Sequence, residues 1–479
     1  MAGLPPPGHP LLSGAEAAAC LEGAYEVIAE IGIEVPNEVW RRKVLAATGR
    51  ERATRVCFSR EEVDGYLRRW RERNGLGEPG WPDEAPWPYA QEPTIALSVM
   101  PYCHTYHDPR TDALVPLTAA RALEATRFLG TFYGQGVHAT ATGHAADVPP
   151  ALQPVLQYKL AAQYNPAGGG CGWFAPPGSA AFIYRMAEVM GAPIDWCVVY
   201  VFSPLRLGGE ELGVTIAHRE RLRVVHVGNM GSVGGTLPIC PKAALALAWA
   251  ETIAGAMCVE ALTGLPANWG GGIEPFDLRA QVIPFGAPEQ ALFRRLSHEA
   301  GAWVRGQSPW GGGVGLLTMA KQPGAQAALE KGTVAAHGAS YGITSLEAGG
   351  SLSCDEVFSP VQLLLDCELR DWLTRLAQGL EHPDDTPDRA LHLIREGLAA
   401  GSFSATDTTL DHYRDVYWFP RHSRREMLGA WERLGRPDAV ESARQEALDR
   451  IESATWVLPE PQFGQLEAIW EAARRASAP

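Results

Sequence analysis

Three short stretches of the sequence combine consecutive glycines with a tryptophan, and these residue types are typical of a cation-binding site. An indole face attracts a quaternary ammonium ion by about 0.5 to 2 kcal/mol, and glycine lets a bulky ligand approach the backbone. We therefore expect Trp173, Trp269 and Trp310 to line one cavity, against the alternative that they pack beside tight turns. The stretches are "GGGCGW" at 168–173, "NWGGG" at 268–272 and "SPWGGGVGLL" at 308–317.

Standard phosphate and nucleophile motifs do not account for these glycines. G-x-x-x-x-G-K-[ST] is absent, and G-x-G-x-x-G fails because its third glycine position holds Trp173, Pro275 or Leu316. There is no G-x-S-x-G elbow and no H-E-x-x-H. In "PYCHTYH", His104 and His107 fall on opposite faces of an expected strand, which argues against a metal site.

Polar and aromatic side chains near other predicted strand ends are further candidates for substrate binding. Arg206 in "SPLRLGG" and Lys321 in "TMAKQPG" are suited to a substrate carboxylate, and Glu347 in "TSLEAGG" to a cation. Surface exposure or a structural role is the alternative for each of them. The aromatic candidates and the histidine are Tyr102, Phe174 and His144.

These residues are spread over a repeating pattern of short apolar runs and amphipathic stretches. Strand followed by helix, at least seven times, is the signature of a parallel α/β architecture. A doubly wound sheet and a (β/α)8 TIM barrel both fit, and we favour the barrel because the repeats are evenly spaced and no dinucleotide fingerprint opens them. The predicted strand runs lie near 136–143, 166–174, 197–204, 223–231, 266–272, 302–313 and 342–347.

The pattern predicts three parts. Residues 1–90 form a helical N-terminal extension, because "GAEAAACLEGAYEVIAEIGIEV" is amphipathic and "SREEVDGYLRRWRERN" opens with a serine cap. Residues 91–380 form the barrel, beginning with a hairpin that turns at "DPRTD". Residues 381–479 form a helical C-terminal extension.

Composition narrows the class of protein. With 46% hydrophobic and 20% charged residues the chain is typical of a globular protein. The net charge of −14 argues against nucleic acid as a partner. The nine cysteines are scattered and never spaced C-x-x-C, as in reduced cytosolic proteins. With no signal-peptide pattern and no apolar run of about 20 residues, we expect a cytoplasmic protein with no membrane partner.

Several longer pieces of the chain resemble the trimethylamine methyltransferase (MttB) superfamily. The resemblance is collinear over most of the chain. The matching pieces include "SPLRLGGEEL" at 203–212, "NMGSVGGTLPICPKAALALAWAETIAGAM" at 229–257, "VIPFGAPEQALFRRLSHEAGAWVRG" at 282–306, "LLLDCELRDWLTRLAQGLE" at 363–381 and "YRDVYWFPRHSRREMLGAWERLG" at 413–435.

The resemblance implies a TIM barrel that moves a methyl group from an amine to the Co(I) of a corrinoid (cobalamin) carried by a separate protein, and implies a homo-oligomer. Archaeal trimethylamine enzymes use pyrrolysine, whose position falls between Gln307 and Lys321, and this chain has only standard residues. It therefore resembles the glycine betaine methyltransferases and their relatives acting on other betaines. Bare backbone for the corrinoid is expected at Gly170, Gly271, Gly312 and Gly313.

Other functions stay open at this point. A sulfonium compound or a tertiary amine has a similar shape and would suit the same aromatic cage. A lyase would need a metal or a Schiff-base lysine, and the predicted strands hold no lysine. A non-catalytic betaine-binding protein would keep the cage without the corrinoid partner.

Overall fold

Short parallel strands, each followed by a helix, form the centre of a mixed α/β fold. The computed structural model describes residues 10–83, 87–89, 94–100, 102–170, 177–380 and 386–477. The central strands pair in two parallel arcs, in chain order except that the last central strand pairs with the first. One arc consists of β8 (Trp196–Phe202), β10 (Val224–Asn229) and β12 (Ala267–Trp269), and the other of β14 (Gly313–Gly315), β15 (Ser345–Glu347), β4 (Ala96–Ser98) and β7 (Val137–His138).

The predicted alternation of strand and helix is confirmed except at 166–174, whose described part, 166–170, forms no strand. A closed ring of eight paired strands is not seen in the part of the chain that the structure describes. Among the described residues no ladder joins β7 to β8 or β12 to β14. At the second break the ring of His298 lies beside the backbone, since a Cβ on Gly312 would be 2.6 Å from it. A side chain from the surrounding helices, that of His298, therefore lies where β12 and β14 do not pair.

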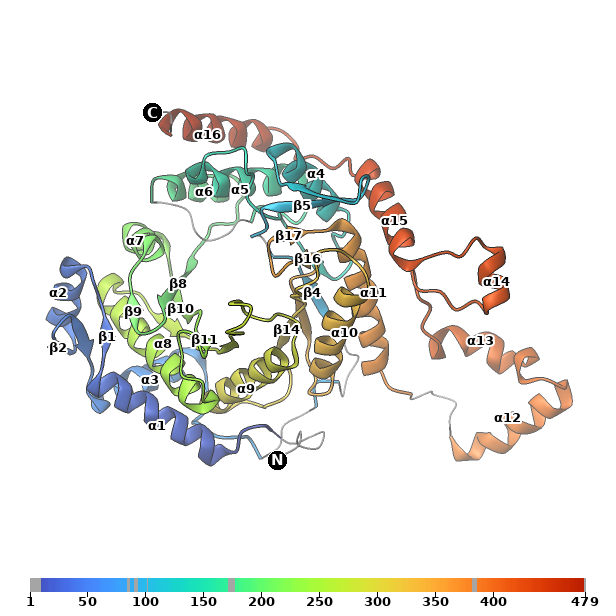
Figure 1. Ribbon diagram of the computed structural model, residues 1–479, viewed down its shortest axis with the longest axis horizontal. Helices are drawn as coiled ribbons and strands as arrows, with labels where there is room; N and C mark the ends of the chain where they lie inside the picture. Colours follow the sequence, from blue (N-terminus) through green and yellow to red (C-terminus); the bar gives the residue numbers. More distant parts are fainter. Residues whose placement is uncertain are drawn as a thin grey trace.

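Helices surround the two arcs, with the strands inside them (Figure 1). Each amphipathic stretch predicted from the sequence forms one of these helices, because periodicity over 12 or more residues is a local property. They are α4 (Ala119–Gly130), α5 (Gln153–Tyr164), α6 (Pro177–Val189), α7 (Glu210–Ala217), α8 (Pro241–Thr263), α9 (Pro288–Val304), α10 (Ala325–Ala339) and α11 (Pro360–Ala377).

A second predicted strand, besides the run at 166–174, is wrong. The run 302–313 was expected to be extended, and its first residues instead end α9, which continues to Val304. Only Gly313 of this run belongs to β14. The apolar "AWV" continues the buried face of the helix through Ala302, Trp303 and Val304, so helix packing decides its conformation.

The N-terminal segment is not purely helical as predicted. The capping box of Ser13 and Glu16 starts α1 (Gly14–Glu30), and Ser59 starts α3 (Arg60–Asn74) in the same way. Three short strands lie between them because Gly32, at φ +72°, ends the helical run. With α2 (Glu38–Ala47) they complete the segment, and they are β1 (Ile33–Glu34), β2 (Arg50–Arg52) and β3 (Arg55–Cys57).

These strands join the first arc. β9 (Arg206–Leu207) folds back antiparallel on β8, and β1 pairs with the other edge of β9. β3 and then β2 follow on the far side of β1. The predicted hairpin at "DPRTD" is confirmed as β5 (Thr105–Asp108) and β6 (Ala113–Pro116). The remaining short strands are β11 (Ser232–Val233), β13 (Glu274–Pro275), β16 (Ser351–Leu352) and β17 (Val357–Phe358).

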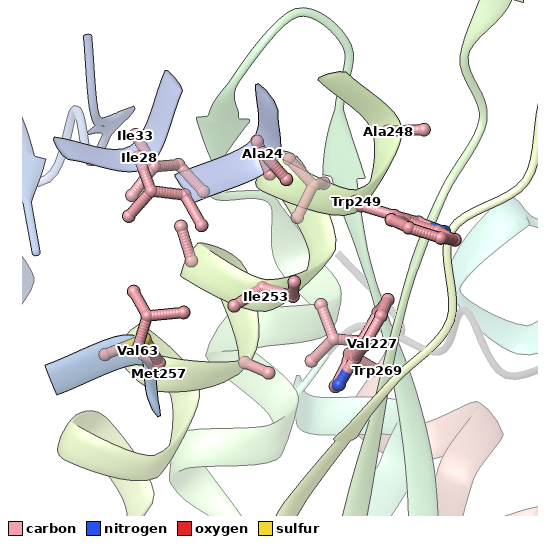
Figure 2. Close-up of a cluster of buried hydrophobic side chains, with 14 of the residues drawn as sticks. Ala24, Ile28, Ile33, Val63, Val227, Ala248, Trp249, Ile253, Met257 and Trp269 are labelled. Carbon is pink, nitrogen blue, oxygen red and sulfur yellow. The ribbon is translucent and has the colours of Figure 1, made fainter. Parts of the chain in front are cut away.

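The largest hydrophobic core lies on the helix side of the first arc. α8 is apolar on all sides because it is packed between the strands and the N-terminal helices. Figure 2 shows Ile28 of α1, Ile253 of α8 and Val227 of β10 in this core. α8 is long and apolar enough to cross a bilayer, but 83% of its most apolar window is buried in the protein, as befits a core helix.

The C-terminal part divides into a packed pair of helices and an arm. α15 (Ala439–Ser453) packs on α11 and α4, and α16 (Gln462–Ala476) on α5 and α6. The arm consists of α12 (Pro387–Ala400), α13 (Asp407–Val416) and α14 (Leu428–Arg433) and extends away from the central helices (Figure 1). Of the residues in these three helices only Gly397 is buried.

Candidate functional site

The inner face of β8 and β10 carries aromatic side chains. Along β8 every second residue, from Cys197 to Val201, is buried against the helices. The alternate residues point to the opposite, inner side because strand side chains alternate. Trp196 on this side meets His226 of β10 edge to face, with ring centroids 5.8 Å apart. The inner set on β8 is Trp196, Val198, Tyr200 and Phe202.

This inner face is accessible. Trp196 is 38% and Phe202 50% exposed, and His138 of β7 and His226 of β10 are exposed as well. In most α/β barrels the interior is filled by layers of branched aliphatic side chains. Here the two large cores lie on the helix side, which leaves aromatic surface available to a ligand.

A cavity lies along β7. It has a volume of about 500 Å³, and its lining includes Val99, His138, Thr140, Ala167 and Gly170. This volume is in the range of small-molecule sites.

A buried glutamate holds the carboxyl ends of β8 and β10 together. Glu251 of α8 accepts hydrogen bonds from Ser203 Oγ at 2.7 Å, Leu205 N at 2.8 Å and Asn229 Nδ2 at 3.1 Å. Asn229 Oδ1 in turn accepts from the backbone N–H of Gly272 at 3.0 Å. Burial raises the pKa of Glu251, and these hydrogen bonds oppose the rise.

The same network fixes the loop that presents Arg206. Leu205 has a left-handed backbone, with φ +53°, which is rare for a branched side chain. Its N–H is bound by Glu251, and its carbonyl accepts from Glu34 N at 2.8 Å. Arg206, the next residue, is exposed and lies opposite Phe202 in the β8–β9 pair. The predicted carboxylate-binding arginine is thus at the carboxyl end of β8.

Other predicted residues lie at the carboxyl ends of the second arc. Tyr102 follows β4 and is half-buried, and His144 follows β7 with its backbone N–H bound to Cys103 O at 2.9 Å. Burial lowers the pKa of His144, and a hydrogen bond with Gln157 of α5 opposes this. The two segments therefore lie side by side.

Glu347 and Lys321 lie at the carboxyl end of the same arc. Glu347 is exposed at the end of β15, and it shares the inner face with Ser345 because a Cβ on Gly313 would meet both side chains. Lys321 is exposed beyond β14 and donates to Met319 O at 2.9 Å.

The structure does not bring the predicted indoles into one cage at the mouth. Trp310 lies before β14, at the amino end of the strand, where its ring is 6.0 Å from that of Trp87. Trp269 is 6% exposed and packs between Trp70 and Trp249 on the helix side. Trp173, with Phe174, lies outside the described residues.

The predicted glycines also have different surroundings. Gly170 borders the cavity along β7. Gly271 is pressed against Ala248 of α8 and Gly312 against His298, so these two face helices instead of a bulky ligand. Gly313 lies against Ser345 on the inner face.

Sequence reasoning missed the aromatic inner face and the Glu251 network. The alternation of "WCVVYVF" at 196–202 signals a strand with two different faces, and it could have identified Tyr200 and Phe202. Nothing in the sequence pairs Glu251 with Ser203, 48 residues away.

Comparison with known proteins gives a family match. Residues 184–460 match the family model described as trimethylamine methyltransferase (MTTB). The glycine betaine methyltransferase of Desulfitobacterium hafniense is 24% identical over 255 residues, which are 53% of this chain and 52% of that protein. Trimethylamine methyltransferase MttB1 of Methanosarcina acetivorans is 25% identical over 320 residues, 64% of this chain and 62% of that protein. This chain thus spans about half to three-fifths of these relatives.

Among solved structures, the monomethylamine methyltransferase MtmB of Methanosarcina barkeri aligns over 92% of this chain and 93% of its own. The TM-score is 0.39 and the identity is 9%. The hydroxylamine complex of MtmB aligns over 93% of each chain, with a TM-score of 0.42 and 10% identity.

Proposed function

Because the chain belongs to the trimethylamine methyltransferase (MTTB) family, we propose that it is a methyltransferase acting on a quaternary amine. The methyl donor is glycine betaine or a related betaine, as the name of the Desulfitobacterium relative suggests. The acceptor is the Co(I) of a corrinoid (cobalamin) carried by a partner protein.

The accessible aromatic inner face of the first arc carries this proposal. Trp196, Tyr200 and Phe202 place three rings along one strand, ending at the carboxyl end where α/β barrels bind substrates. A quaternary ammonium cannot donate hydrogen bonds, so aromatic faces and nearby negative charge are what a protein can offer it. Exposed Glu347 on the inner face of β15 supplies such a charge.

Methyl transfer from a quaternary amine makes small demands on side-chain chemistry. The leaving group is a neutral tertiary amine, so it needs neither a general acid nor a protein nucleophile. A bound corrinoid supplies the nucleophile that takes the methyl group. The residues of this chain bind the cation, orient one N–CH₃ bond towards the opening and exclude water, and orientation alone contributes several kcal/mol.

The inner face leaves room for a flat acceptor. Near the carboxyl ends of β10 and β12 the positions Gly228 and Gly270 carry no side chain, and Gly270 is exposed. Backbone without side chains permits a close approach. Gly170 and Gly313 add to this surface in the proposal.

We place donor binding on the predicted residues Tyr102, His144, Arg206, Lys321 and Glu347, which lie near the carboxyl ends of the strands. Trp173 and Phe174 belong to the proposed set as well, and they lie outside the described residues. The expected position of Trp310 at the mouth is corrected by its place at the amino end of β14. Trp269 is moved to the helix side, where Arg305 lines the same cavity and its fixed positive charge would repel an ammonium ion.

The two arcs are best explained as parts of one (β/α)8 TIM barrel, because their strand order follows the chain. In this proposal the barrel occupies residues 91–380, between extensions at 1–90 and 381–479. We also propose a cytoplasmic location and no nucleic-acid or membrane partner, in keeping with the net charge of −14 and the scattered cysteines.

We also propose a homo-oligomer, because one helix of the arm has an exposed apolar face. α12 exposes Leu391, Ile394 and Leu398, which are 55%, 49% and 71% accessible and lie on one helical face. Exposed apolar faces of this kind mark protein contacts.

The deciding experiment mixes the full chain with cob(I)alamin and one methyl donor at a time, and follows the loss of Co(I) absorbance. The panel is glycine betaine, proline betaine, carnitine, trimethylamine and a sulfonium analogue. Reaction with a betaine and not with trimethylamine supports the proposal. Reaction only with the sulfonium or the tertiary amine replaces the donor, and betaine binding by calorimetry without reaction indicates a binding protein.

A further inference from the structure

Arg305, whose side chain has no carboxylate partner among the described residues, lines a small cavity between the helix layer and the break after β12. The cavity has a volume of about 120 Å³ and lies among Trp70, Trp249, Trp269, His298 and Arg305. In the described part of the chain the Arg305 guanidinium makes neither a hydrogen bond nor an ion pair. Burial lowers the pKa of Arg305, and no carboxylate opposes this.

Such an arginine is unusual. Arg305 is half-buried, and an arginine that is withdrawn from water usually has a carboxylate partner. The aromatic ring of Trp70 lies 6.0 Å from the guanidinium carbon, at the outer limit of a cation–π contact. For comparison, Arg295 of α9, the helix that ends just before Arg305, is paired with Glu299 at 2.7 Å. Arg305 therefore lacks the counter-ion that its neighbour has.

A second observation points to a ligand with acceptor oxygens. Trp269 is 6% exposed, and its indole Nε1 is buried without an acceptor. An indole N–H can only donate, so it calls for an acceptor oxygen. Figure 2 shows the nitrogen of Trp269 on the side of the ring away from Trp249. Ser297, whose hydroxyl accepts from Ile273 N at 3.1 Å, also lines the cavity.

His298 adds an acceptor to this set of donors. It makes a backbone hydrogen bond with Pro309, which can only be to the carbonyl, and its Nε2 is buried without a partner. Burial lowers the pKa of His298, and the nearby charge of Arg305 lowers it further. The ring is then neutral, and Nε2 carries a lone pair that can accept from a hydroxyl or a water beside the ligand.

We propose that this cavity binds a small oxyanion, a carboxylate or a phosphate, through the guanidinium of Arg305 and the Nε1–H of Trp269. A planar guanidinium offers parallel N–H groups that match two oxygens. The site opens towards the inner face, since Arg305 Nη2 lies 4.0 Å from the place where a Cβ on Gly270 would be. A ligand can therefore be a free oxyanion or the carboxylate end of a molecule bound inside the ring.

The proposal that an oxyanion binds here depends only on the residues around the cavity. The idea that this oxyanion is the carboxylate of the methyl donor rests on the proposed function. The test is therefore made by binding and thermal unfolding, which need no methyl transfer.

The experiment titrates the full chain with acetate and with inorganic phosphate at constant ionic strength, following calorimetry and the unfolding temperature. The variants are Arg305→Gln, which removes the charge, and Trp269→Phe, which keeps the ring and removes the N–H. Matched controls are Arg223→Gln, at an exposed surface ion pair with Asp195, and Trp372→Phe, at an exposed indole on α11.

We expect at least one oxyanion to bind the unaltered chain and both controls. Arg305→Gln should raise its Kd at least tenfold, equal to about 1.4 kcal/mol, and Trp269→Phe severalfold. Without oxyanion, Arg305→Gln should unfold at about the same temperature, because the change breaks no side-chain hydrogen bond or ion pair among the described residues. A purely structural arginine would instead lower that temperature. Equal binding by Arg305→Gln, or no binding by the unaltered chain, overturns the inference.

A second pair of ligands identifies the source. Glycine betaine carries a carboxylate, and choline is a quaternary ammonium ion without one. A preference for betaine that disappears in Arg305→Gln assigns the site to the carboxylate of the donor. Acetate or phosphate binding with no change in the betaine preference assigns it to a separate oxyanion.

Discussion

Replacing Glu251 with alanine tests whether the carboxyl ends of β8 and β10 depend on one buried side chain. The change removes the acceptor of three hydrogen bonds, from Ser203, Leu205 and Asn229. The N–H of Leu205 is buried and has no route to water, so its loss costs about 1 to 3 kcal/mol. Ser203 and Asn229 are half-buried, and the loss of each of their hydrogen bonds to Glu251 costs about 1 kcal/mol.

Relief of the buried carboxylate offsets part of this loss. We expect Glu251→Ala to lower the free energy of unfolding by about 2 to 4 kcal/mol. Glu251→Gln keeps one acceptor oxygen and should cost about half as much. Urea unfolding followed by tryptophan fluorescence measures the shift in midpoint, which reports the change in stability while the slope is constant. Exposed Glu452 on α15, changed to alanine, is the control for the loss of one negative charge.

The pH dependence supplies an independent check on Glu251. Burial raises its pKa from the ordinary value of 4.5. An acid with a raised pKa binds more protons in the folded chain, so folding becomes more favourable as the pH falls from above the raised value towards 4.5. Glutamine does not titrate, so the stability difference between the unaltered chain and Glu251→Gln should grow on acidification. A flat difference, or a cost of Glu251→Ala under about 0.5 kcal/mol, would refute the reasoning.

Three further predictions concern other parts of the molecule. Asp366→Asn should lower the free energy of unfolding, measured in urea, by about 3 to 5 kcal/mol, because it leaves the buried ammonium of Lys331, 2.7 Å away, uncompensated. Adding Lys331→Met should recover part of this loss. Strictly additive effects of the two changes would contradict the pairing. Gly143→Ala should cost at least about 2 kcal/mol, since φ is +62° and the new Cβ would lie 2.0 Å from Cys103 O, whereas Gly178→Ala has open space and should be tolerated. Leu398→Glu on the arm should reduce the mass measured by light scattering during gel filtration, and Val39→Glu, equally exposed on α2, should not.

The helices were predictable and the exact ends of the strands were not. Helical periodicity is read from neighbours three and four residues apart, so α8 and α9 are evident in the sequence. The end of α9 depends on what Ala302, Trp303 and Val304 pack against. Extending that helix to Val304 moved the following strand to Gly313–Gly315. This shift put Trp310 at the amino end of the strand instead of the carboxyl end.

The polar groups that organise the site were not predictable for a different reason. Glu251 meets Ser203 across 48 positions and Asn229 across 22, and only the packing of α8 on the strands joins them. The isolation of Arg305 is likewise visible only in the folded chain, because sequence shows charges and not their partners. Sequence did place Arg206, Lys321 and Glu347 near strand ends, since turn signals follow each apolar run.

The positions of Trp269 and Arg305 constrain how a zwitterionic donor would bind. The carboxylate of a betaine needs positive charge beside it, and its ammonium group needs aromatic faces or negative charge. In this chain the arginine and the aromatic side chains lie on different elements. Arg305 stands at the break after β12, where its charge would repel an ammonium group. The rings of Tyr200 and Phe202 lie on the inner face of β8, next to β10 in the same arc. With the carboxylate bound at Arg305, the ammonium end would point to the space between the two arcs, towards the aromatic side chains of Tyr200 and Phe202. Under the proposed function and the proposed oxyanion site, a donor without a carboxylate would lose this orientation, and we expect betaines to bind more tightly than trimethylamine.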